Sequence, residues 1–480
     1  MLFPDFEHTT WLGPSALFAF YLVGILHVLH ALMHVRTSQG TIAWVISLVT
    51  VPFLAIPMYW LLGRTRFSKK IGGRRENDSN LNKLATAMHE RLRCYEVEIP
   101  DDDAFERAAQ LLGGLPFTRG NDLELLIDGD VTFERIFEAI REAEHYLCVN
   151  FFIVKNDTLG TKFQNALIER AKAGVKVFFL FDEIGSYKLP RRYLRAMKDA
   201  GIECNSFGIN RFWWSRLQVN FRNHRKIVIS DGKTAFVGGL NVGDEYLGRD
   251  QRYGGWRDTH LKMRGPVVQA VQTVFLEDWF WASNNIPELH WETLPEPADQ
   301  IAAIIPTGPA DSVDSWQLLV AEAANTSRKK LWIASPYFVP DEGVLTALQV
   351  AAIRGVDVRI LIPERADQLL VWLSAFSYYE QSIPFGVKLF CYQQGFLHQK
   401  VMLIDDRLAA VGTANLDNRS FRLNFEITAF STDRKFVGEV DAMLVKDFSR
   451  AREATVEDIT GKPLYFRVAC RAARLFAPIQ

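Results

Sequence analysis

Two long apolar stretches lie near the amino terminus of this chain. Residues 16–35 are apolar except for three histidines, and residues 42–62 contain no charged side chain. About 20 helical residues cross the hydrocarbon core of a bilayer, which is about 30 Å thick. The short polar segment 36–41 joins the two stretches. The sequence therefore predicts a transmembrane hairpin of two helices, in which proline is tolerated.

Lysine and arginine are unevenly distributed around this predicted hairpin. None precedes it, Arg36 alone lies in the joining segment, and six follow in the basic cluster at 64–75, which completes an amino-terminal region of residues 1–75. By the positive-inside rule, the rest of the chain is expected in the cytoplasm. The basic cluster is interpreted either as a topology signal only or also as a binding surface for anionic lipid headgroups. Asp5 and Glu7 stand where a cleaved signal peptide would carry positive charge, which disfavours such a leader.

Three histidines share one face of the first predicted helix. His27, His30 and His34 are spaced i, i+3 and i+7. A metal site would need further ligands, and no carboxylate or second ligand set is nearby. Packing against the second helix is therefore the preferred interpretation.

Strand and helix patterns alternate after a charged linker at 76–115. Apolar runs of strand length, rich in β-branched and aromatic residues, are separated by stretches with helical periodicity. The expected strands are 123–127, 146–154, 175–181, 330–333 and 356–362, and the expected helices are 131–144, 161–173, 315–324 and 343–354. Such alternation predicts an α/β protein with mixed, mostly parallel sheets flanked by helices.

The order of these elements occurs twice. The segment Ala-Gly174-Val-Lys-Val in the first part matches Arg-Gly355-Val-Asp-Val in the second, about 180 residues later. In both, glycine ends a helix, where the backbone needs a positive φ, and a strand follows. The proline-containing stretch 295–309 separates the two parts. We therefore predict two duplicated α/β domains, at 116–295 and 296–480.

Each predicted domain contains the same spaced set of polar residues. The spacing is His-x-Lys-x4-Asp, followed by an asparagine 17 residues after the histidine. Identical spacing at matching places of a duplicated domain is hard to reach by chance. The set in the first domain is His224, Lys226, Asp231 and Asn241, and the set in the second is His398, Lys400, Asp405 and Asn415.

The spacing brings these side chains together. A histidine and a lysine two residues apart in a strand point to the same face of the sheet. The chain turns at Asp231 or Asp405, which are expected to act structurally in the hairpin and in salt bridges, and it returns with the asparagine beside the histidine and lysine. Two facing clusters of this kind suit a phosphodiester. Lysine and asparagine donate hydrogen bonds to its oxygens, one histidine attacks phosphorus, and the other exchanges a proton with the alcohol.

A nucleophilic histidine also needs a partner that orients its far ring nitrogen. Glu426, 28 residues after His398, and Asp258, 34 residues after His224, are the candidates for this role, one in each domain. Ordinary salt bridges are the alternative role for both carboxylates. His260, close to Asp258, is interpreted as a strand histidine whose hydrogen bonds are satisfied.

The doubled motif resembles the phospholipase D superfamily. The apolar hairpin, the basic cluster and the segments 336–340, 415–420 and 424–426 are also similar to those of bacterial cardiolipin synthases, and the resemblance covers nearly the whole chain. It implies phosphatidyl transfer from one phosphatidylglycerol to another, with cardiolipin and glycerol as products, through a phosphohistidine and without a metal or other cofactor. On this resemblance, His224 is the expected nucleophile and His398 the expected general acid and base. The implied location is the cytoplasmic face of the bacterial inner membrane.

Composition and charge exclude some other classes. Hydrophobic residues make up 48% of the 480 residues, which excludes a disordered chain. The formal net charge of −1 disfavours a nucleic-acid-binding protein, including a nuclease of the same superfamily. The five cysteines are scattered, so neither a disulfide framework nor a metal motif is expected. A hydrolase that releases phosphatidic acid stays open, because water and an alcohol can use the same base, whereas a membrane scaffold would have no use for the paired polar sets.

Two further segments combine arginine with large apolar side chains. In 211–216, two tryptophans stand among arginines, which suits a membrane interface or core packing. Near the carboxyl terminus, Arg467, Arg471 and Arg474 are spaced i, i+4 and i+7. This spacing predicts a helix with a cationic face, either on a membrane surface or on the surface of the domain. The sequence leaves open the donor lipid, phosphatidylglycerol or phosphatidylethanolamine, and the oligomeric state.

Overall fold

The structure is a computed structural model in which residues 12–35, 38–63, 90–208, 220–292, 294–365 and 367–480 are described. It consists of two parts. The amino-terminal part comprises Met1–Arg75 with Ile209–Phe221, and the second part comprises Glu76–Gly208 with Arg222–Gln480. The basic cluster at 64–75 and the tryptophan-containing segment 211–216 lie outside the described residues.

The two apolar stretches form three helices. The first stretch is helix α1 (Leu12–His34), whereas the second is divided into α2 (Ser38–Thr50) and α3 (Pro52–Leu62). The prediction of one continuous helix over 42–62 is therefore wrong. Pro52 disfavours helical backbone at Val51, which has φ −137° and ψ 57°. Its missing N–H costs nothing at the start of a helix, so the chain begins a new helix there.

The helices of the amino-terminal part pack through the predicted histidine face. The Nδ1 atom of His30 lies 2.8 Å from the hydroxyl oxygen of Tyr59 in α3, and the rings of His27 and Trp60 meet edge to face at 5.4 Å. Packing of the histidines against the second apolar stretch is thus confirmed. Across the described residues, no helix combines the length and the apolarity that crossing a membrane requires. The transmembrane hairpin stays a prediction.

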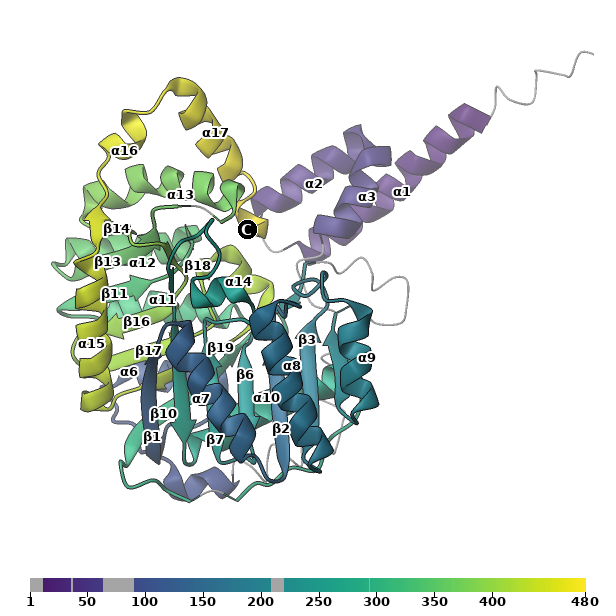
Figure 1. Ribbon diagram of the computed structural model, residues 1–480. Helices are drawn as coiled ribbons and strands as arrows, with labels where there is room; N and C mark the ends of the chain where they lie inside the picture. Colours follow the sequence, from purple (N-terminus) through teal and green to yellow (C-terminus); the bar gives the residue numbers. More distant parts are fainter. Residues whose placement is uncertain (1–11, 36–37, 64–89, 209–219, 293, 366) are drawn as a thin grey trace, which may run out of the picture. The chain divides into compact units, whose positions relative to one another are not determined.

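The second part is built on one mixed β-sheet (Figure 1). Its strands from the first domain are β1 (Thr118–Ile127), β2 (Tyr146–Phe151), β3 (Lys176–Asp182), β4 (Glu203–Phe207), β5 (Arg222–Asn223), β6 (Ile227–Ser230), β7 (Thr234–Gly238) and β9 (Thr259–Arg264). Its strands from the second domain are β10 (Gln300–Thr307), β11 (Lys330–Ala334), β13 (Asp357–Pro363), β14 (Lys388–Tyr392), β16 (Val401–Ile404), β17 (Leu408–Gly412), β19 (Asn424–Ser431) and β20 (Ala451–Glu453). Because β1 pairs with β10, a single sheet runs through both domains.

The two domains repeat one strand order, but their sheet is not mostly parallel. The outer strands β2–β3–β4 and β11–β13–β14 are parallel. The inner strands β6–β7–β9 and β16–β17–β19 are antiparallel. The prediction of mostly parallel sheets is therefore wrong. Helices connect the outer strands of each domain, whereas tight turns join β6 to β7 and β16 to β17, and a tight turn makes its two strands antiparallel.

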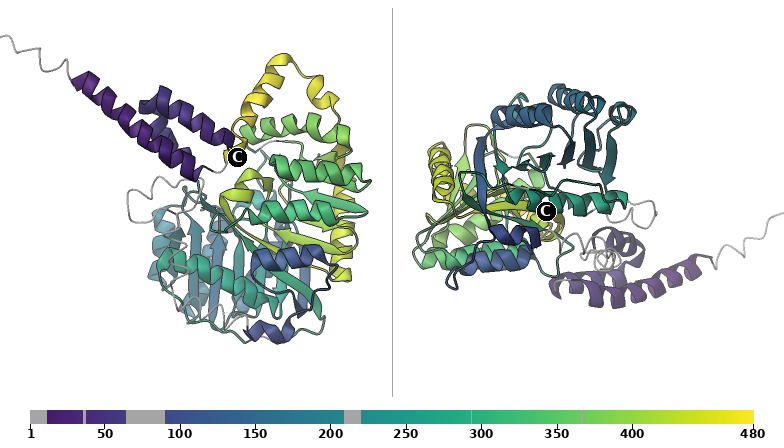
Figure 2. Two further views of the ribbon diagram at one scale, coloured as in Figure 1. Left: turned by 180° about the vertical axis from the view of Figure 1, so that it is seen from behind. Right: turned by 90° about the horizontal axis from the view of Figure 1, so that it is seen from below.

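Helices cover both faces of the sheet. In the first domain, α7 (Gly129–Glu142) and α8 (Thr158–Lys172) lie on one face, and α10 (Val267–Ser283) lies across the other (Figures 1 and 2). The remaining large helices are α9 (Arg191–Asp199), α11 (Ser315–Thr326), α12 (Glu342–Ile353), α13 (Leu369–Ser382) and α15 (Arg434–Phe448). Ile136 and Ile140 of α7 and Val149 of β2 have no exposed surface, so the core lies between the helices and the sheet. Each strand and helix expected from the sequence between residues 116 and 362 is present, with bounds shifted by a few residues.

The last long helix, α17 (Leu464–Arg474), lies on α13. Arg471 Nη2 is 3.3 Å from the carboxylate of Glu380, and the rings of Phe466 and Trp372 meet at 5.9 Å. The arginine side of this helix is therefore partly engaged with the domain. Several of its apolar side chains are exposed instead, namely Leu464, Tyr465 and Val468, followed by Leu475 and Phe476 beyond its end.

Candidate active site

Each motif histidine directly follows a short strand that pairs with a strand of the other domain. Strand β5, which precedes His224, pairs in parallel with β19 of the second domain, and β15 (Phe396–Leu397), which precedes His398, pairs with β8 (Trp256–Arg257) of the first. The His224 backbone N–H donates to the carbonyl of Phe425 at 2.9 Å, and that of His398 donates to the carbonyl of Arg257 at 2.8 Å. Each histidine therefore enters the site beside a strand of the opposite domain.

Each histidine is held by a carboxylate from the opposite domain. His224 Nδ1 lies 2.9 Å from Oε2 of Glu426, and His398 Nδ1 lies 2.8 Å from Oδ2 of Asp258. Both carboxylates are completely buried. The spacing in the sequence associates each carboxylate with the histidine of its own domain. In the structure, each carboxylate bonds the histidine of the other domain. This pairing follows from the short strands. Glu426 lies on β19, which pairs with β5 before His224, and Asp258 directly follows β8, which pairs with β15 before His398.

Burial keeps both imidazoles neutral. It lowers the pKa of His224 to about 4, and Lys226 adds to this lowering, whereas the nearby Glu426 opposes it. Burial, with Lys400, lowers the pKa of His398 to about 3. A neutral imidazole that donates its Nδ1–H to a carboxylate keeps the lone pair of Nε2 for a substrate. The protein thus holds two oriented imidazoles, each of which can act as a nucleophile or a base.

The two motif lysines are buried beside the histidines. Burial lowers the pKa of the Lys400 ammonium to about 8 and that of Lys226 well below its usual range. Lys400 Nζ lies 3.0 Å from Nδ1 of His398, and Lys226 Nζ donates to the carbonyl of His224. A bound anion would offset the cost of burying these two cations.

The two motif asparagines also reach this place. Asn241 Oδ1 accepts the backbone N–H of Ile153 at 3.0 Å, and its Nδ2 donates to the hydroxyl of Tyr246 at 3.1 Å. Asn415 Nδ2 donates to Asp417 at 3.1 Å, and its buried Oδ1 has no hydrogen-bond partner within the described part of the chain. Both carboxamides thus line the same cavity as the two histidines.

A cavity of about 1020 Å³ joins the two clusters. Both histidines and both asparagines line it. Aromatic rings support the imidazoles from the side, with Phe152 at 5.0 Å from His224 and Trp256 at 5.2 Å from His398. The arrangement fits a phosphodiester held between two imidazoles, with ammonium and carboxamide donors around its oxygens.

The sequence is similar to known proteins over nearly its whole length. A family model described as "Cardiolipin synthase, PLD-like domain" matches residues 136–279 and 320–448, and one described as "Phospholipase_D-nuclease N-terminal" matches residues 19–64. Cardiolipin synthase A of Pseudomonas putida (strain W619) is 44% identical over 462 residues, 96% of this chain and 96% of that protein. Cardiolipin synthase A of Pseudomonas entomophila (strain L48) is 43% identical over 475 residues, 97% of this chain and 99% of that protein. The chain belongs to the cardiolipin synthase family.

A solved structure shares the fold of this family member. The phosphatidylserine synthase of Haemophilus influenzae Rd KW20 superposes with a TM-score of 0.59, covering 79% of this chain and 100% of that chain at 16% identity. The duplicated phospholipase D-like α/β fold predicted from the sequence is thereby confirmed. The resemblance to cardiolipin synthases, made on the motifs, is confirmed by the curated relatives.

The aspartates of the family motif lie away from the cavity. Asp231 has a positive φ of 54° in the turn between β6 and β7, and its carboxylate accepts the backbone N–H groups of residues 144–146 at 2.8 Å. Asp405, with φ 52°, does the same for residues 328–330. These contacts fit the structural role in the hairpin that the sequence predicts for both aspartates. The expected salt bridges are absent for both within the described residues, because backbone N–H groups occupy their oxygens.

Some residues of the site escaped the sequence analysis. Three residues of the second domain also line the cavity, namely Tyr337, Asp367 and Gln368. Of these, only Tyr337 lies in a segment, 336–340, that contributes to the family resemblance. Asp367 follows β13 in a loop without a motif, so no local signal marked it. His260 is a strand histidine in β9 as expected, but neither of its ring nitrogens has a partner in the described structure, and burial lowers its pKa to about 3.

Proposed function

We propose that this member of the cardiolipin synthase family transfers a phosphatidyl group from one phosphatidylglycerol to another, releasing glycerol and forming cardiolipin. The observation that carries the proposal is the pair of facing imidazoles in one cavity, each with its Nδ1 bonded to a buried carboxylate. The family resemblance supports the lipid donor and acceptor. Phosphatidylethanolamine as the donor is one outcome of the test below.

In the first step, Nε2 of His224 attacks phosphorus of the donor lipid. The bond from phosphorus to the glycerol oxygen breaks, and His398 gives a proton to that oxygen as glycerol leaves. The phosphatidyl group is then bound to His224 through a P–N bond. In the second step, a hydroxyl of the acceptor phosphatidylglycerol attacks the same phosphorus, the P–N bond breaks, and His398 takes the hydroxyl proton.

The remaining motif residues stabilise the charge that develops on phosphorus. Lys226 and Lys400 place two ammonium groups next to the histidines, and Asn241 and Asn415 add carboxamide N–H donors. Preorganised donors of this kind stabilise the transition state because they need not reorient during the reaction. The anionic substrate also favours the protonated form of His398, which burial disfavours in the protein alone.

Membrane association at the cytoplasmic face belongs to the same proposal. In the amino-terminal part, α1 presents a row of exposed apolar side chains, namely Phe18, Leu22, Ile25, Leu29 and Met33. The second part exposes the apolar side chains on α17 and beyond its end described above. Apolar groups of this size lose contact with water when they enter a lipid surface, which favours binding of the protein where its lipid substrates lie.

The test uses the purified full-length chain in detergent micelles that contain phosphatidylglycerol as the only phospholipid, with a chelator present. Cardiolipin and free glycerol, read by mass spectrometry and absent with His224→Ala, are the expected products. Phosphatidic acid without cardiolipin would replace the proposal by a hydrolase. Product formed only after phosphatidylethanolamine is added would overturn phosphatidylglycerol as the sole donor.

A trapping experiment tests the assignment of the two histidines. In His398→Ala, the nucleophile is intact but the general acid and base is lost, so we expect a phosphatidyl adduct to accumulate on His224. Peptide mass spectrometry after rapid acid-free quenching locates the adduct. An adduct on His398 in the converse variant, His224→Ala, with none in His398→Ala would reverse the roles of the two histidines.

A further inference from the structure

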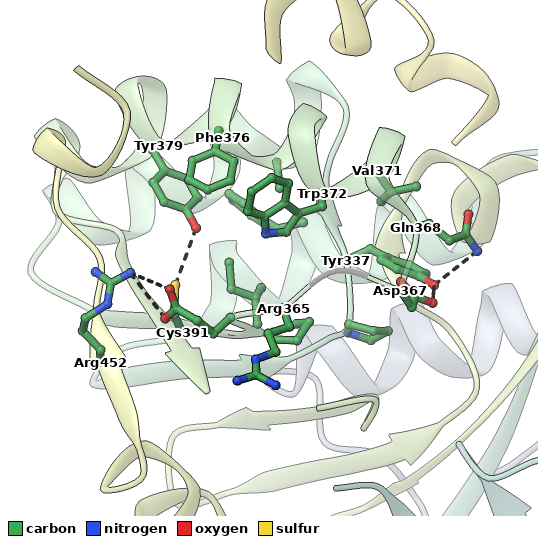
Figure 3. Close-up of a pocket in the computed structure, with 16 residues that line it drawn as sticks. Tyr337, Arg365, Asp367, Gln368, Val371, Trp372, Phe376, Tyr379, Cys391 and Arg452 are labelled. Atoms are coloured by element: carbon green, nitrogen blue, oxygen red, sulfur yellow. Dashed lines mark hydrogen bonds and ion pairs between the residues drawn. The ribbon is translucent and has the colours of Figure 1, made fainter. Parts of the chain in front are cut away.

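One wall of the cavity carries a hydrogen-bonded group of polar side chains that the motifs do not include. The Tyr337 hydroxyl donates to Oδ2 of Asp367 at 2.6 Å, and Gln368 Nε2 donates to the Tyr337 oxygen at 3.4 Å. Figure 3 shows the three side chains together at one end of a side pocket beneath α13. The same residues line the main cavity, so this polar wall belongs to both spaces.

Among the residues of the first domain that the structure describes, the polar wall has no counterpart. The pairings of β2 with β6 and of β11 with β16 make Asn150 equivalent to Ala334, so Ile153 is the equivalent of Tyr337. The charged residues that the first domain contributes to the cavity are four basic ones, Lys155, Lys188, Arg192 and Arg222, and two acidic ones, Asp157 and Glu245, whereas the second domain contributes Asp367, Asp417 and Arg419. The two ends of a nearly two-fold site are therefore chemically different, one with an excess of basic and the other with an excess of acidic side chains.

The acidic end lies on the side of His398. Burial lowers the pKa of Lys400, and the carboxylate of Asp367 is close enough to oppose that lowering. Tyr246, whose ring is 6.5 Å from that of His398, lines the same cavity as Tyr337. His398 is the residue that exchanges a proton with the alcohol in the proposed reaction, so the alcohol enters and leaves on this side.

The chemistry of this wall suits hydroxyl groups and not a phosphate. A carboxylate accepts hydrogen bonds from hydroxyls and repels a phosphate, whereas an amide side chain such as Gln368 can donate to a hydroxyl oxygen or accept from it. Tyr337 already orients Asp367, so little side-chain entropy is lost when a ligand binds. A glycerol headgroup offers two hydroxyls on neighbouring carbons, one to be bound and one to react.

We propose that Asp367, Tyr337 and Gln368 form a polyol subsite that binds the non-reacting hydroxyl of the glycerol headgroup and so favours an alcohol over water as acceptor. The inference rests on the proposed function, since it concerns the acceptor of the same transfer. With one hydroxyl held by Asp367, the neighbouring hydroxyl oxygen attacks phosphorus of the phosphatidyl-histidine. The P–N bond breaks, and the hydroxyl proton passes to Nε2 of His398.

The experiment compares two acceptors in the full-length enzyme with Asp367→Asn, which keeps the size of the side chain. One reaction is the reversal, in which cardiolipin and glycerol give phosphatidylglycerol, and the other gives cardiolipin's phosphatidyl group to n-butanol, which has a single hydroxyl. We expect the KM for glycerol to rise about tenfold, as loss of a hydrogen bond to a charged group would cause, and transfer to n-butanol to stay within about twofold. The fraction of phosphatidic acid formed from phosphatidylglycerol should rise as well.

Matched controls separate this result from a loss of fold. Glu364→Gln removes a carboxylate from the same loop, where its oxygen bonds Arg452 at 3.1 Å at the far end of the side pocket, and should leave both acceptors unchanged. Gln368→Ala changes an exposed residue and should raise the KM for glycerol by a few fold. Equal losses for glycerol and n-butanol, or an unchanged KM for glycerol in Asp367→Asn, would overturn the subsite. Failure of the unaltered enzyme to transfer from any phospholipid would instead overturn the proposed function.

Discussion

Single residues decide whether the imidazoles can act. Glu426 lies 202 positions from His224, and Asp258 lies 140 positions from His398, yet each carboxylate bonds directly to Nδ1 of its imidazole. In this arrangement the carboxylate fixes the tautomer that leaves Nε2 free to react, and it stabilises the imidazolium that forms later. The shape of the side chain matters less than its negative charge and its two acceptor oxygens.

Replacement of these carboxylates by amides tests the crossed pairs. We expect Glu426→Gln to lower kcat by about 10²- to 10⁴-fold, because an amide can hold His224 in the wrong tautomer. Asp258→Asn should lower kcat to a similar extent through His398. Glu138→Gln, whose carboxylate lies beside Arg135 on α7, is the control and should retain full activity. The test measures steady-state rates with phosphatidylglycerol in mixed micelles. A loss of kcat of less than threefold in both amide variants would contradict the proposed role of the carboxylates.

The pH dependence of the rate should report Lys400. Burial lowers the pKa of this ammonium to about 8, so the group is charged below that pH and neutral above it. Only the charged form neutralises the substrate phosphate, so kcat/KM should fall as the pH rises above about 8, by up to tenfold per pH unit. A bound phosphate raises this pKa, so the same limb in kcat should lie at higher pH.

Lys400→Arg is the matched variant for this pH profile. Arginine stays protonated throughout the accessible range, so the alkaline limb should disappear, although the absolute rate falls because the guanidinium has a different shape. Rates are measured from pH 6 to pH 10 at constant micelle composition. A profile that is flat to pH 10 in the unaltered enzyme, or an alkaline limb that persists in Lys400→Arg, would assign the limb to another group.

At the scale of elements, the His-x-Lys-x4-Asp spacing describes a strand and the turn that ends it. At one end of the segment the histidine lines the cavity and the lysine is buried beside it. At the other end the aspartate bonds the turn to the backbone at the start of the neighbouring strand. In Asp231 and Asp405 the positive φ is one that aspartate adopts more readily than most residues, and the carboxylate satisfies backbone N–H groups that would otherwise be left unpaired. One motif therefore combines chemistry with folding.

Asp231→Ala should consequently lower the stability of the fold and leave the catalytic rate nearly unchanged. We expect the free energy of unfolding to fall by about 1–3 kcal/mol, because three backbone N–H groups, that of the buried Tyr146 among them, lose their acceptor. Thermal unfolding measures the loss, and the rate per folded molecule should stay within about threefold of the unaltered protein below the transition. An unchanged melting temperature together with a large loss of kcat would instead place Asp231 in the catalytic step.

Elements also show how far the sequence alone could lead. Periodicity predicted the strands and helices, and the repeated spacing predicted which side chains meet, because both depend on neighbours in the chain. The sequence predicted more parallel strand pairs than the sheet contains. Alternation of strands with helices holds for the parallel outer strands but not for the antiparallel inner ones. The crossed carboxylates could not be predicted, because they depend on the two-residue strands β5 and β15, which have no periodicity to detect. The break between α2 and α3 was visible in Pro52 but is tolerated in many membrane helices.

At the scale of the whole second part, the two domains complete one another. Neither domain alone contains a histidine with its carboxylate, so the site exists only where β5 meets β19 and β15 meets β8. Buried ion pairs fix this junction. Arg257, whose carbonyl accepts the backbone N–H of His398, places Nη2 at 2.6 Å from Asp447 of α15. Arg225, next to His224, donates Nε to the carbonyl of Glu426 in the second domain at 2.9 Å, and it is held within the first domain by Asp278 of α10 at 2.6 Å.

Removal of Asp447 should therefore weaken the fold and the site together. Arg257 would keep a buried charge with the partly exposed Asp128, 3.2 Å away, as its remaining carboxylate partner. Breaking a buried ion pair costs up to about 3–5 kcal/mol, so Asp447→Ala should unfold at a much lower denaturant concentration and lose most of its activity. The control on the same helix is Asp441→Ala. The Asp441 carboxylate bonds the partly exposed Lys330, so its loss should cost less than about 1 kcal/mol.

The double variant Arg257→Met with Asp447→Leu fills the same space without charge and should recover much of the stability. Because His398 takes its position from the backbone of Arg257 and its charge partner from Asp258, that double variant should also recover activity in proportion to its folded fraction. Equal losses in Asp447→Ala and Asp441→Ala would show that the junction does not depend on this pair.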